Sequence, residues 1–573
     1  MVRKGLRVED SPWSPWLRFY PSGVPHQVSA PDADLGLLLD AAARAHPRRT
    51  ALLFFGRRTS YHALARRIER FADGLHTLGV RPGDRVALLL PNCPQFVVAF
   101  FATLRLGAVV VPTDPQYSEH ELRRQLDEVG AVAVVAFDGV VRKAAAARDG
   151  TRVRHLISAD LSRALPPWLR LWLRLAPRLP LARRMRGPKV LRARLAPGLP
   201  PGTRAVPFDE VSGDGTAPPW PRVEPDDTAV LQFTGGTTGV PRAAVLTHRN
   251  LAANAHQLAA WHAPLEATGT TVAVLPLHHP HGLTAGLGAG LLAGSRTVLL
   301  PTLNTGRLLR ACRRWSPGVL HATPPVYRAL LERPERELEA LRSLRMCVSS
   351  GQRLPAELVA RFEAATHVPL TDSYGLTEAA PLVLANPLNA NARPGTAGLP
   401  LPGTEVVIAE TTEPGQAGEL LVRGPQVFAG YWNDPRATEG ALTPDGWLRT
   451  GDIAVLSPDG FVTLIDRRDD VITVGGLPVF PSEVEDVLAE HPAVQDAVVT
   501  GVPHPAHGEV VKAFLTLADG AELNTPQVVG HCTGRLAPYK VPALVEIRTA
   551  PLPRSPSGKV LRRALRGASA YGA

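Results

Sequence analysis

The sequence has few cysteines, no signal-peptide pattern and no long uninterrupted hydrophobic run. Its four cysteines lie far apart and form no CxxC pair, which argues against a disulfide framework and a structural zinc site. The first residues, MVRKGLRVEDSPWSPW, lack the continuous apolar core of a signal peptide. The most apolar region, residues 86–112, is interrupted by Pro91, Asn92, Pro94 and Arg105, which a membrane-spanning helix does not readily accept. We therefore expect a cytoplasmic protein that does not cross a membrane.

Length and composition indicate several α/β domains. At 573 residues the chain is too long for one ordinary core. It is 45% hydrophobic and 20% charged, which is typical of a globular protein, and its 50 glycines and 56 prolines follow no repeat. Residues 86–112 and 272–301 each have the pattern of a buried strand, a helix and a second buried strand. The sequence thus predicts a doubly wound α/β body.

The excess positive charge lies in one segment. The formal net charge is +11, and Leu161–Phe208 contains eleven Arg and Lys and no Asp or Glu. In its stretch PPWLRLWLRLAPR, three arginines at spacings of four share one helical stripe, and two tryptophans and two leucines occupy the opposite arc. These residues are Arg170, Arg174, Arg178, Trp168, Leu171, Trp172 and Leu175.

This basic segment has two interpretations. It is either an interfacial helix that contacts the inner face of a membrane or a surface insertion whose apolar side packs on the protein. Nucleic acid is not an expected partner, because no surface of interleaved aromatic and basic residues and no helix-turn-helix pattern accompanies the charge.

A stretch rich in glycine and threonine, QFTGGTTGVPRAAVLTH at residues 232–248, indicates a phosphate-binding loop. Glycine lets backbone N–H groups approach a phosphate closely, and the hydroxyls add donors. The Walker pattern GxxxxGK[ST] does not fit, because Val240 stands five residues after Gly235 and Pro241 stands five after Gly236. The loop is therefore expected to hold phosphate in another way.

Four further blocks accompany this loop: SYGLTEAAP at 373–381, GWLRTGD at 446–452, DRRDDVI at 466–472 and PLPRSPSGKVLRR at 551–563. In order and spacing, the five blocks resemble the signatures of the adenylate-forming superfamily of acyl-CoA synthetases, peptide-synthetase adenylation domains and beetle luciferases. The resemblance covers roughly residues 35–570, and the chain looks most like the bacterial long-chain fatty acid CoA ligases.

The resemblance implies a division into two domains. Residues 1–468 would form a large N-terminal body of doubly wound α/β subdomains with a small β-barrel, and residues 469–573 would form a small mobile α+β domain. In the second domain, Ser482 and Glu485 have the pattern of a capping box ahead of a helix. Strands are expected at DAVVTGV and VVKAFLTL, which follow that helix.

The resemblance also implies the reaction. Members of the superfamily use ATP and Mg²⁺ to convert a carboxylic acid to acyl-AMP and pyrophosphate, and the thiol of coenzyme A then displaces AMP. A fatty acid is the expected substrate here, because residues 282–294 contain no acidic side chain that would bind the ammonium group of an amino acid.

Residues that match the family's blocks would form the nucleotide site. Tyr374 would stack on adenine beside Gly375, Asp452 would accept hydrogen bonds from both ribose hydroxyls, and Arg467 would reach the ribose and the phosphate. Glu378, with Thr377, would hold Mg²⁺, because a carboxylate is a hard oxygen ligand for a hard ion. The phosphates would be bound by Thr234, Gly235, Gly236, Thr237, Thr238, Gly239 and Arg242.

The chemistry would depend on residues from both domains. Lys559 would lie between the acyl carboxylate and the α-phosphate and stabilise the transition state, and it is the principal catalytic residue expected, with Arg467 and Glu378 beside it. His279, at the meeting of the acyl pocket and the thiol tunnel, would act as a gate. Asp469 would be the hinge on which the small domain rotates. Gly475 and Gly476 would then line the tunnel for coenzyme A.

Several features leave alternatives open. Arg242 and Ala243 replace the lysine and glycine usual in the family, and the block SSGQRLP at residues 349–355 departs from its usual SGGAPLP. Four glycines on one predicted helix indicate either room for an alkyl tail or close packing against the sheet: Gly282, Gly286, Gly288 and Gly290. An aryl acid as substrate, a carrier-protein thiol as acceptor and a non-catalytic nucleotide or lipid binder are the competing interpretations. The oligomeric state is not determined by the sequence.

Overall fold

The computed structural model describes most of the chain. The described residues are 14–28, 34–175, 204–213, 220–234, 241–262, 269–387, 389, 391–411, 414–505, 507–554 and 560–566. Three groups of predicted residues lie outside this part of the chain: the loop residues Gly235, Gly236, Thr237, Thr238 and Gly239, residues 176–203 of the basic segment, and Lys559.

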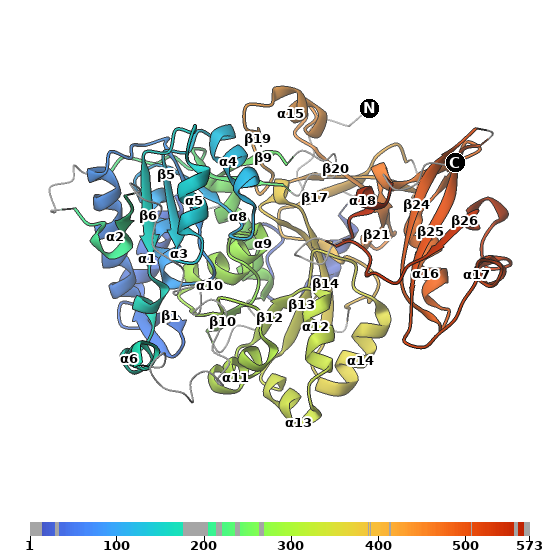
Figure 1. Cartoon of the computed structure of the whole chain (residues 1–573), viewed down its shortest axis with the longest axis horizontal. Helices are drawn as coiled ribbons and strands as arrows, with labels where there is room; N and C mark the ends of the chain where they lie inside the picture. The colour runs from blue at the N-terminus through green and yellow to red at the C-terminus, as the bar shows by residue number, and fades with distance from the viewer. Residues whose placement is uncertain are drawn as a thin grey trace.

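An eight-stranded sheet forms the first half of the body (Figure 1). Its central strands are parallel and buried on both faces, as expected for runs of Val, Ala and Leu between covering helices. The strand order is β19 (Gly430–Tyr431), β9 (Ala243–Thr247), β8 (Thr228–Phe233), β4 (Val109–Pro112), β3 (Arg85–Leu89), β5 (Ala133–Phe137), β6 (His155–Ala159) and β7 (Val206–Pro207). The helices of this half are α2 (Tyr61–Thr77), α3 (Pro94–Arg105), α4 (Glu119–Glu128), α5 (Val141–Ala147), α6 (Pro167–Leu175) and α8 (His248–His262).

A nine-stranded sheet forms the second half. Its strands are parallel from β14 to β1 and antiparallel at both edges. The order is β16 (Leu399–Pro400), β15 (Leu382–Ala385), β14 (Leu370–Gly375), β13 (Met346–Ser349), β12 (Val319–Ala322), β10 (Thr270–Ala273), β11 (Arg296–Leu299), β1 (Thr50–Phe54) and β2 (Arg57–Ser60). Its helices are α1 (Leu35–Ala45), α9 (Pro280–Leu283), α10 (Ala289–Leu292), α11 (Thr305–Trp315), α12 (Pro324–Leu331), α13 (Glu335–Leu338) and α14 (Ala356–Thr366).

Both predicted strand–helix–strand units are confirmed. Residues 86–112 form β3, α3 and β4, and residues 272–301 form β10, a helical segment and β11. That helical segment is α9, a π-helical stretch at Thr284–Gly288, and α10. A Cβ on Gly282 would lie 2.0 Å from the Pro276 carbonyl oxygen, and one on Gly290 would lie 2.9 Å from Thr271 Oγ1. Gly282 and Gly290 therefore serve close packing rather than room for an alkyl tail.

The predicted small β-barrel is not found in the described part of the chain. Residues 405–467 instead form a four-stranded antiparallel sheet of β17 (Glu405–Ile408), β18 (Ala417–Arg423), β20 (Leu448–Leu456) and β21 (Val462–Arg467). A barrel closes only when the first and last strands pair with each other. Here β17 pairs with β18 and β21 pairs with β20, so the sheet stays open. Helix α15 (Pro435–Ala441) and β19 lie between β18 and β20 in the chain.

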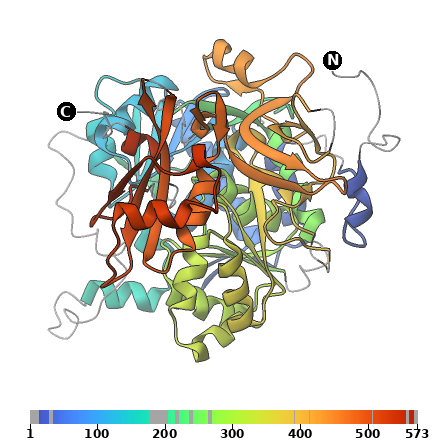
Figure 2. The same ribbon diagram turned by 90° about the vertical axis from the view of Figure 1, so that its right-hand side faces the viewer.

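The C-terminal part has its own sheet and its own core. The order is β23 (Leu477–Val479), β22 (Ile472–Val474), β25 (Gly508–Leu517) and β24 (Val494–His504), and β26 (Leu544–Ile547) pairs with β25. Helices α16 (Pro481–Ala489), α17 (Thr525–Cys532) and α18 (Arg562–Arg566) complete it. Figures 1 and 2 show this sheet at the end of the molecule opposite α2 and β6. The strands predicted at DAVVTGV and VVKAFLTL are confirmed as parts of β24 and β25.

The predicted capping box at Ser482 and Glu485 is wrong. Helix α16 begins at Pro481, with Phe480 as its N-cap, so Ser482 is already inside the first turn. The Ser482 hydroxyl donates to the Ile465 carbonyl instead, and Glu485 accepts from the Val499 N–H and from Arg562. Both side chains therefore bond to residues elsewhere in the fold instead of capping the helix.

Two expectations based on absences agree with the described residues. All four cysteines are buried, and none forms a disulfide. Among the described helices, none is both long enough and apolar enough to cross a bilayer.

Candidate functional site

Three side chains from three strands meet at the centre of the candidate site. Tyr374 lies near the end of β14, and Asp452 and Arg467 are direct cross-strand partners on β20 and β21. The Tyr374 hydroxyl donates to Asp452 Oδ2, and Arg467 Nε lies 2.6 Å from Asp452 Oδ1. Tyr374 and Asp452 are buried. The structure thus brings together the residues that the sequence predicted for adenine and ribose.

Burial and charge fix the protonation states of Tyr374 and Arg467. Burial raises the pKa of the Tyr374 hydroxyl well above its ordinary value, and the neighbouring Asp452 charge raises it further. Burial alone would lower the pKa of Arg467, but the nearby negative charge, above all that of Asp452, raises it overall. Tyr374 is therefore a neutral donor, and Arg467 is a permanent cation. A carboxylate accepts about four hydrogen bonds, so Asp452 is able to accept from several donors at once.

Glu378 is held by a tyrosine that sequence reasoning missed. Glu378 lies in the short helical turn η10 (Thr377–Ala379) that follows β14. The hydroxyl of Tyr431, on β19, donates to Glu378 Oε1 at 2.7 Å. The backbone strengthens the same junction, because the Phe428 N–H donates to the Glu378 carbonyl at 2.9 Å. The sequence signal was the aromatic pair Tyr431 and Trp432, which no predicted block included.

Arg242, the residue directly before β9, joins this group. Its guanidinium carbon lies 5.7 Å from the centre of the Tyr431 ring, and its Nε lies 3.2 Å from Asp434 Oδ2. Burial and the nearby Glu378 charge raise the pKa of Tyr431, so that its phenol stays protonated beside Arg242. Arg242, which replaces the family's usual lysine, therefore lies over the ring of the tyrosine that also bonds Glu378.

The ends of the glycine-rich loop are held together. The Thr234 N–H donates to the Arg242 carbonyl at 2.9 Å, and the Arg242 N–H donates to Thr234 Oγ1 at 3.4 Å. Strands β8 and β9, which flank this loop in the sequence, are antiparallel neighbours. On the other side of β9, Tyr431 pairs with Ala244. The predicted phosphate loop thus begins and ends beside Glu378 and Tyr431.

Close packing requires glycine after Tyr374. A Cβ on Gly375 would lie 2.1 Å from the Pro381 carbonyl oxygen, a distance that no side chain tolerates. This contact folds the chain back sharply, so that Thr377 and Glu378 follow directly after the strand. The position of Glu378 therefore depends on having glycine, which has no side chain, at residue 375.

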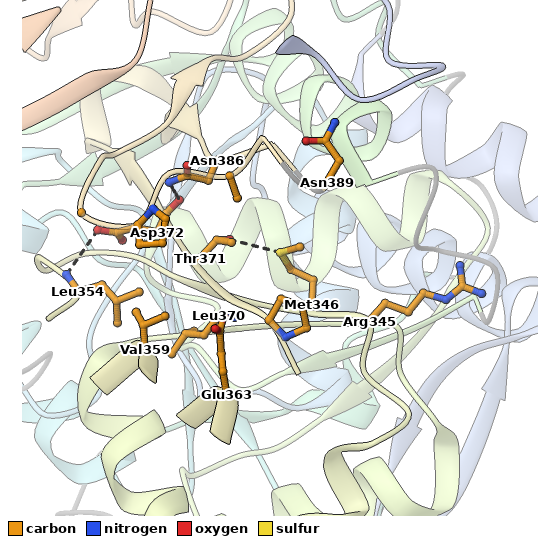
Figure 3. Close-up of a pocket in the computed structure, with 14 residues that line it drawn as sticks. Arg345, Met346, Leu354, Val359, Glu363, Leu370, Thr371, Asp372, Asn386 and Asn389 are labelled. Carbon is orange, nitrogen blue, oxygen red and sulfur yellow. Dashed lines mark hydrogen bonds between the residues drawn. The ribbon is translucent and has the colours of Figure 1, made fainter. Parts of the chain in front are cut away.

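A half-buried acid two residues before Tyr374 was also missed. Asp372, on the same strand, lines a pocket of about 190 Å³ (Figure 3). Burial raises its pKa to about 7, and the Leu354 N–H donates to its Oδ2 at 3.4 Å. Leu354 belongs to the SSGQRLP block, which departs from the family's usual SGGAPLP. Asp372 is thus an acceptor that an amino group on a base could use.

Histidines surround the segment that carries His279. His279 is exposed at the start of α9, as a gate residue requires. Behind it, Ser350 Oγ lies 2.9 Å from His281 Nδ1, and His281 Nε2 lies 3.3 Å from His321 Nδ1. The rings of His321 and His262 are 5.0 Å apart. Among the described residues, no group of three His, Cys, Asp or Glu is placed to hold a metal ion. Ser350, His281 and His321 form a hydrogen-bonded polar group, and the His262 ring packs against His321.

The predicted hinge lies where the chain passes from the four-stranded sheet to the C-terminal sheet, and the predicted tunnel residues lie within the C-terminal sheet. Asp469 is exposed in the short turn Arg468–Asp470 that directly follows β21. Gly475 and Gly476 form the turn between β22 and β23 with φ of +57° and +84°, and a Cβ on either would meet nothing within 4 Å. In this arrangement the two glycines face open space. An ion pair of 2.7 Å between Arg353 and Asp486 joins the SSGQRLP block to α16.

Lys559 itself lies outside the described residues, but the chain on both sides of it is fixed. Arg554 and Val560 form an isolated β-bridge, and Arg554 pairs with Asp496 at 2.6 Å. Arg562 pairs with Glu485 at 2.7 Å and lies 3.7 Å from Asp470, next to the predicted hinge. The chain on the C-terminal side of Lys559 is thus anchored near the junction between the two parts.

Comparison with known families agrees with these blocks. Residues 39–432 match the model of the AMP-binding enzyme family, and residues 483–559 match that of the AMP-binding enzyme C-terminal domain. The chain is 35% identical over 570 residues to the long-chain-fatty-acid–CoA ligase of Bacillus subtilis (strain 168), covering 96% of this chain and 97% of the relative. It is 32% identical to a feruloyl-CoA synthase of Amycolatopsis sp., covering 91% of this chain and 96% of the relative.

A solved structure shares the whole architecture. The crystal structure of ATP-bound MatB from Rhodopseudomonas palustris superposes with a TM-score of 0.78 at 28% identity. The match covers 94% of this chain and 99% of that one, so it includes the C-terminal sheet as well as the body.

Proposed function

Because this chain belongs to the AMP-binding enzyme family and is an acid–thiol ligase, we propose that it activates a long-chain fatty acid with ATP and transfers the acyl group to coenzyme A. The observation that carries the proposal is the convergence of Tyr374, Asp452 and Arg467 beside Glu378. Tyr374 comes from the nine-stranded sheet, Asp452 and Arg467 come from the four-stranded sheet, and Glu378 lies in the turn after β14.

The nucleotide would be bound by side chains that already hold one another in place. Tyr374 would offer its ring to adenine while its hydroxyl stays on Asp452, and Asp372 would accept from the base amino group. Asp452 would accept from both ribose hydroxyls, because a carboxylate can accept several hydrogen bonds at once. Since the trio is preformed, little ordering is needed on binding.

The residues around Glu378 fit a magnesium ion. Glu378 is a carboxylate whose Oε1 is held by Tyr431, so its second oxygen is oriented rather than free to rotate. Glu378, with the Thr377 hydroxyl, would hold Mg²⁺, which when bound neutralises charge on the phosphates. Arg242 would add a permanent cation at the same place, as the replacement for the family's lysine.

In the first step, a carboxylate oxygen of the fatty acid attacks the α-phosphorus, and the bond between that phosphorus and the bridging oxygen breaks. Pyrophosphate leaves with the electron pair, and acyl-AMP remains. Lys559 would lie between the two approaching anions, and Arg467 would stabilise charge on the α-phosphate. The loop residues Thr234, Gly235, Gly236, Thr237, Thr238 and Gly239 would bind the departing pyrophosphate.

In the second step, the coenzyme A thiol loses its proton and attacks the acyl carbonyl, and AMP leaves with the oxygen. We place the boundary between the two domains at residues 468 and 469, with Asp469 as the hinge. The support is that β22–β26 form a separate sheet directly after Asp469. Rotation would break the Arg353–Asp486 ion pair and bring Gly475 and Gly476 to the thiol tunnel, with His279 at its inner end.

Acid-dependent release of pyrophosphate tests the proposal. Saturated fatty acids of increasing length should each support pyrophosphate release. When coenzyme A is added, its thiol should be consumed. Pyrophosphate release without consumption of coenzyme A would point to a carrier-protein thiol as the acceptor. If no acid supports pyrophosphate release, the remaining interpretation is that the chain is a non-catalytic nucleotide or lipid binder.

An aryl acid is the second candidate substrate, and one observation favours it. The feruloyl-CoA synthase relative covers nearly the whole chain at 32% identity. The polar group of Ser350, His281 and His321 lies behind His279, where an oxygenated ring would find hydrogen-bond partners. Hydroxycinnamic acids therefore belong in the same panel, and a preference for them would replace the fatty acid assignment.

We also propose that α6, in the basic segment Leu161–Phe208, contacts a membrane surface. Trp168 and Leu171 are 68% and 58% exposed, although Leu169 between them packs against the core. The interpretation that the apolar side of this helix packs on the protein does not account for those two side chains. Trp168→Ala/Leu171→Ala should weaken sedimentation with vesicles, whereas Ile547→Ala, which removes another exposed apolar side chain, should not.

A further inference from the structure

A second basic surface lies outside the segment that carries the sequence's excess charge. Residues 267–331 contain six arginines and no Asp or Glu. Four of the six lie on α11, and β2, at the edge of the nine-stranded sheet, adds two more. We define the α11 surface as Arg57, Arg58, Arg296, Arg307, Arg310, Arg313 and Arg314.

Three of these guanidinium groups surround one indole ring. The central carbons of Arg58, Arg296 and Arg314 lie 5.5, 5.5 and 5.1 Å from the centre of the Trp315 ring. These residues come from β2, β11 and α11, so the tertiary fold gathers them. The face of an aromatic ring attracts cations, which allows like charges to be held close together without a carboxylate.

No carboxylate neutralises this cluster within the described part of the chain. None of the seven arginines of the α11 surface forms an ion pair with a described acid, although many arginines elsewhere do. Acids do occur on the neighbouring turn, but Glu337 pairs with Arg333 at 2.6 Å and Glu339 with Arg342 at 3.7 Å. Burial and the charge of Arg310 both lower the pKa of Arg307, as expected in a positive local potential.

The α11 surface is exposed and continuous with α6. Arg57, Arg58, Arg310, Arg313 and Arg314 are exposed. Arg57 donates to the carbonyl oxygens of Arg163 and Leu165, immediately before α6 begins. Figure 1 shows α6 and α11 near each other at the same edge of the molecule, with β1 above them. An apolar residue, Leu303, is 50% exposed just before α11.

We infer that the α11 surface binds the anionic headgroups of a lipid bilayer. Two observations favour a bilayer over a soluble anion or nucleic acid. The arginines are spread over two strands and a helix and do not converge on one pocket, and exposed apolar side chains occur on α6 and just before α11, namely Trp168, Leu171 and Leu303. Bases would require a surface on which to stack, but the Trp315 ring is already surrounded by arginines. The inference does not depend on the proposed ligase activity.

Vesicle binding by a matched pair of variants tests the inference. The test variant is Arg310→Gln/Arg313→Gln/Arg314→Gln in the full chain. The control is Arg222→Gln/Arg361→Gln/Arg436→Gln, which removes the same charge from exposed positions on other faces. Sedimentation is measured with vesicles of phosphatidylcholine alone and with vesicles that also contain phosphatidylglycerol. Thermal unfolding and acid-dependent pyrophosphate release show that each variant is folded and has its site intact.

The unmodified chain should bind the phosphatidylglycerol vesicles more tightly than phosphatidylcholine, and added salt should weaken that binding. One arginine near an anionic surface contributes about fivefold, so the test variant should bind on the order of 100-fold more weakly. The control should stay within about threefold of the unmodified chain. Equal loss in both variants, unchanged binding by the test variant, or tighter binding to duplex RNA than to vesicles would each overturn the inference. Loss of vesicle binding with normal pyrophosphate release would leave the ligase proposal intact.

Discussion

Asp452 and Arg467 face each other across β20 and β21, and Arg467 Nε lies 2.6 Å from Asp452 Oδ1. A second cross-strand pair in the same sheet, Glu405 and Arg423, has its closest atoms 2.7 Å apart. Only the first pair also receives the hydroxyl of a buried tyrosine, Tyr374. The two pairs have similar geometry but different surroundings, so the Glu405–Arg423 pair is a control for the Asp452–Arg467 pair.

We expect Asp452→Asn to lower kcat/KM for ATP roughly 10- to 100-fold, since hydrogen bonds to a charged group contribute about 1.5–3 kcal/mol. The amide keeps the size of the side chain but cannot accept from Arg467 and both ribose hydroxyls together. Pyrophosphate release at varied ATP measures the effect. Glu405→Gln should leave that ratio unchanged, and an equal effect of both substitutions would contradict a nucleotide role for Asp452.

Tyr431 should act as a positioning residue for Glu378. Tyr431→Phe removes only the hydroxyl that donates at 2.7 Å, so the Glu378 carboxylate would be free to rotate. We expect the Mg²⁺ concentration for half-maximal pyrophosphate release to rise about tenfold, with a smaller change in the maximal rate. Tyr20→Phe, which removes a hydroxyl bonded to the Pro400 carbonyl, is the control. A purely structural role would change stability and leave the Mg²⁺ dependence alone.

Lys559→Ala should separate the two half-reactions. Without the cation between the two anions, acyl-AMP formation should fall about 100- to 1,000-fold, as when one preorganised donor is removed. Conversion of supplied acyl-AMP to thioester should continue. Lys540→Ala, which removes a C-terminal lysine paired with Glu483, should affect neither step. Equal loss of both steps in the Lys559 variant would refute its assigned role.

Asp469→Pro should impair only the second step. Asp469 lies in the turn after β21, and proline restricts φ there without removing a buried side chain. We expect near-normal pyrophosphate release and slow thioester formation, measured in the same preparation. Asp469→Ala keeps backbone freedom and should support both steps. If thioester formation by the proline variant equals that of the alanine variant, the hinge lies elsewhere.

The buried histidines predict a loss of stability in acid. Burial lowers the pKa of His262 from 6.5 to about 3, so the folded chain keeps this imidazole neutral where the unfolded chain protonates it. Stability is therefore fully present above pH 6.5 and is lost as pH falls toward 3, at roughly 1.4 kcal/mol per pH unit for this group. Urea unfolding of the unmodified chain and of His262→Gln at several pH values measures the difference.

The slope of stability against pH should be smaller in His262→Gln, because that side chain no longer titrates. His120→Gln removes an exposed histidine on α4 and should leave the slope unchanged. An identical slope in all three proteins would show that His262 does not carry the effect. His281 and His321 keep part of the slope in every variant, because burial holds the pKa of each well below 6.5.

The sequence pattern correctly predicted features that depend on interactions within one short stretch of chain. The strand–helix–strand units at 86–112 and 272–301 were recognisable because fully buried parallel strands need continuous apolar runs. It failed where a side chain had a choice of partners. Ser482 and Glu485 match a capping box, yet Ile465 and Arg562 took their hydrogen bonds. The resemblance implied a small β-barrel, but closure depends on which edge strands pair, and the sheet formed by residues 405–467 stays open.

By itself the sequence determined the family, the two α/β sheets and the identity of Tyr374, Glu378, Asp452 and Arg467 as site candidates, because each lies in a short block of fixed spacing. Only the tertiary structure decided that Tyr431 orients Glu378, that Asp372 lines a pocket, and that arginines of β2, β11 and α11 meet at Trp315. The reason is physical. Spacing along a chain fixes which residues share one element, whereas contacts between distant segments depend on how sheets and helices pack.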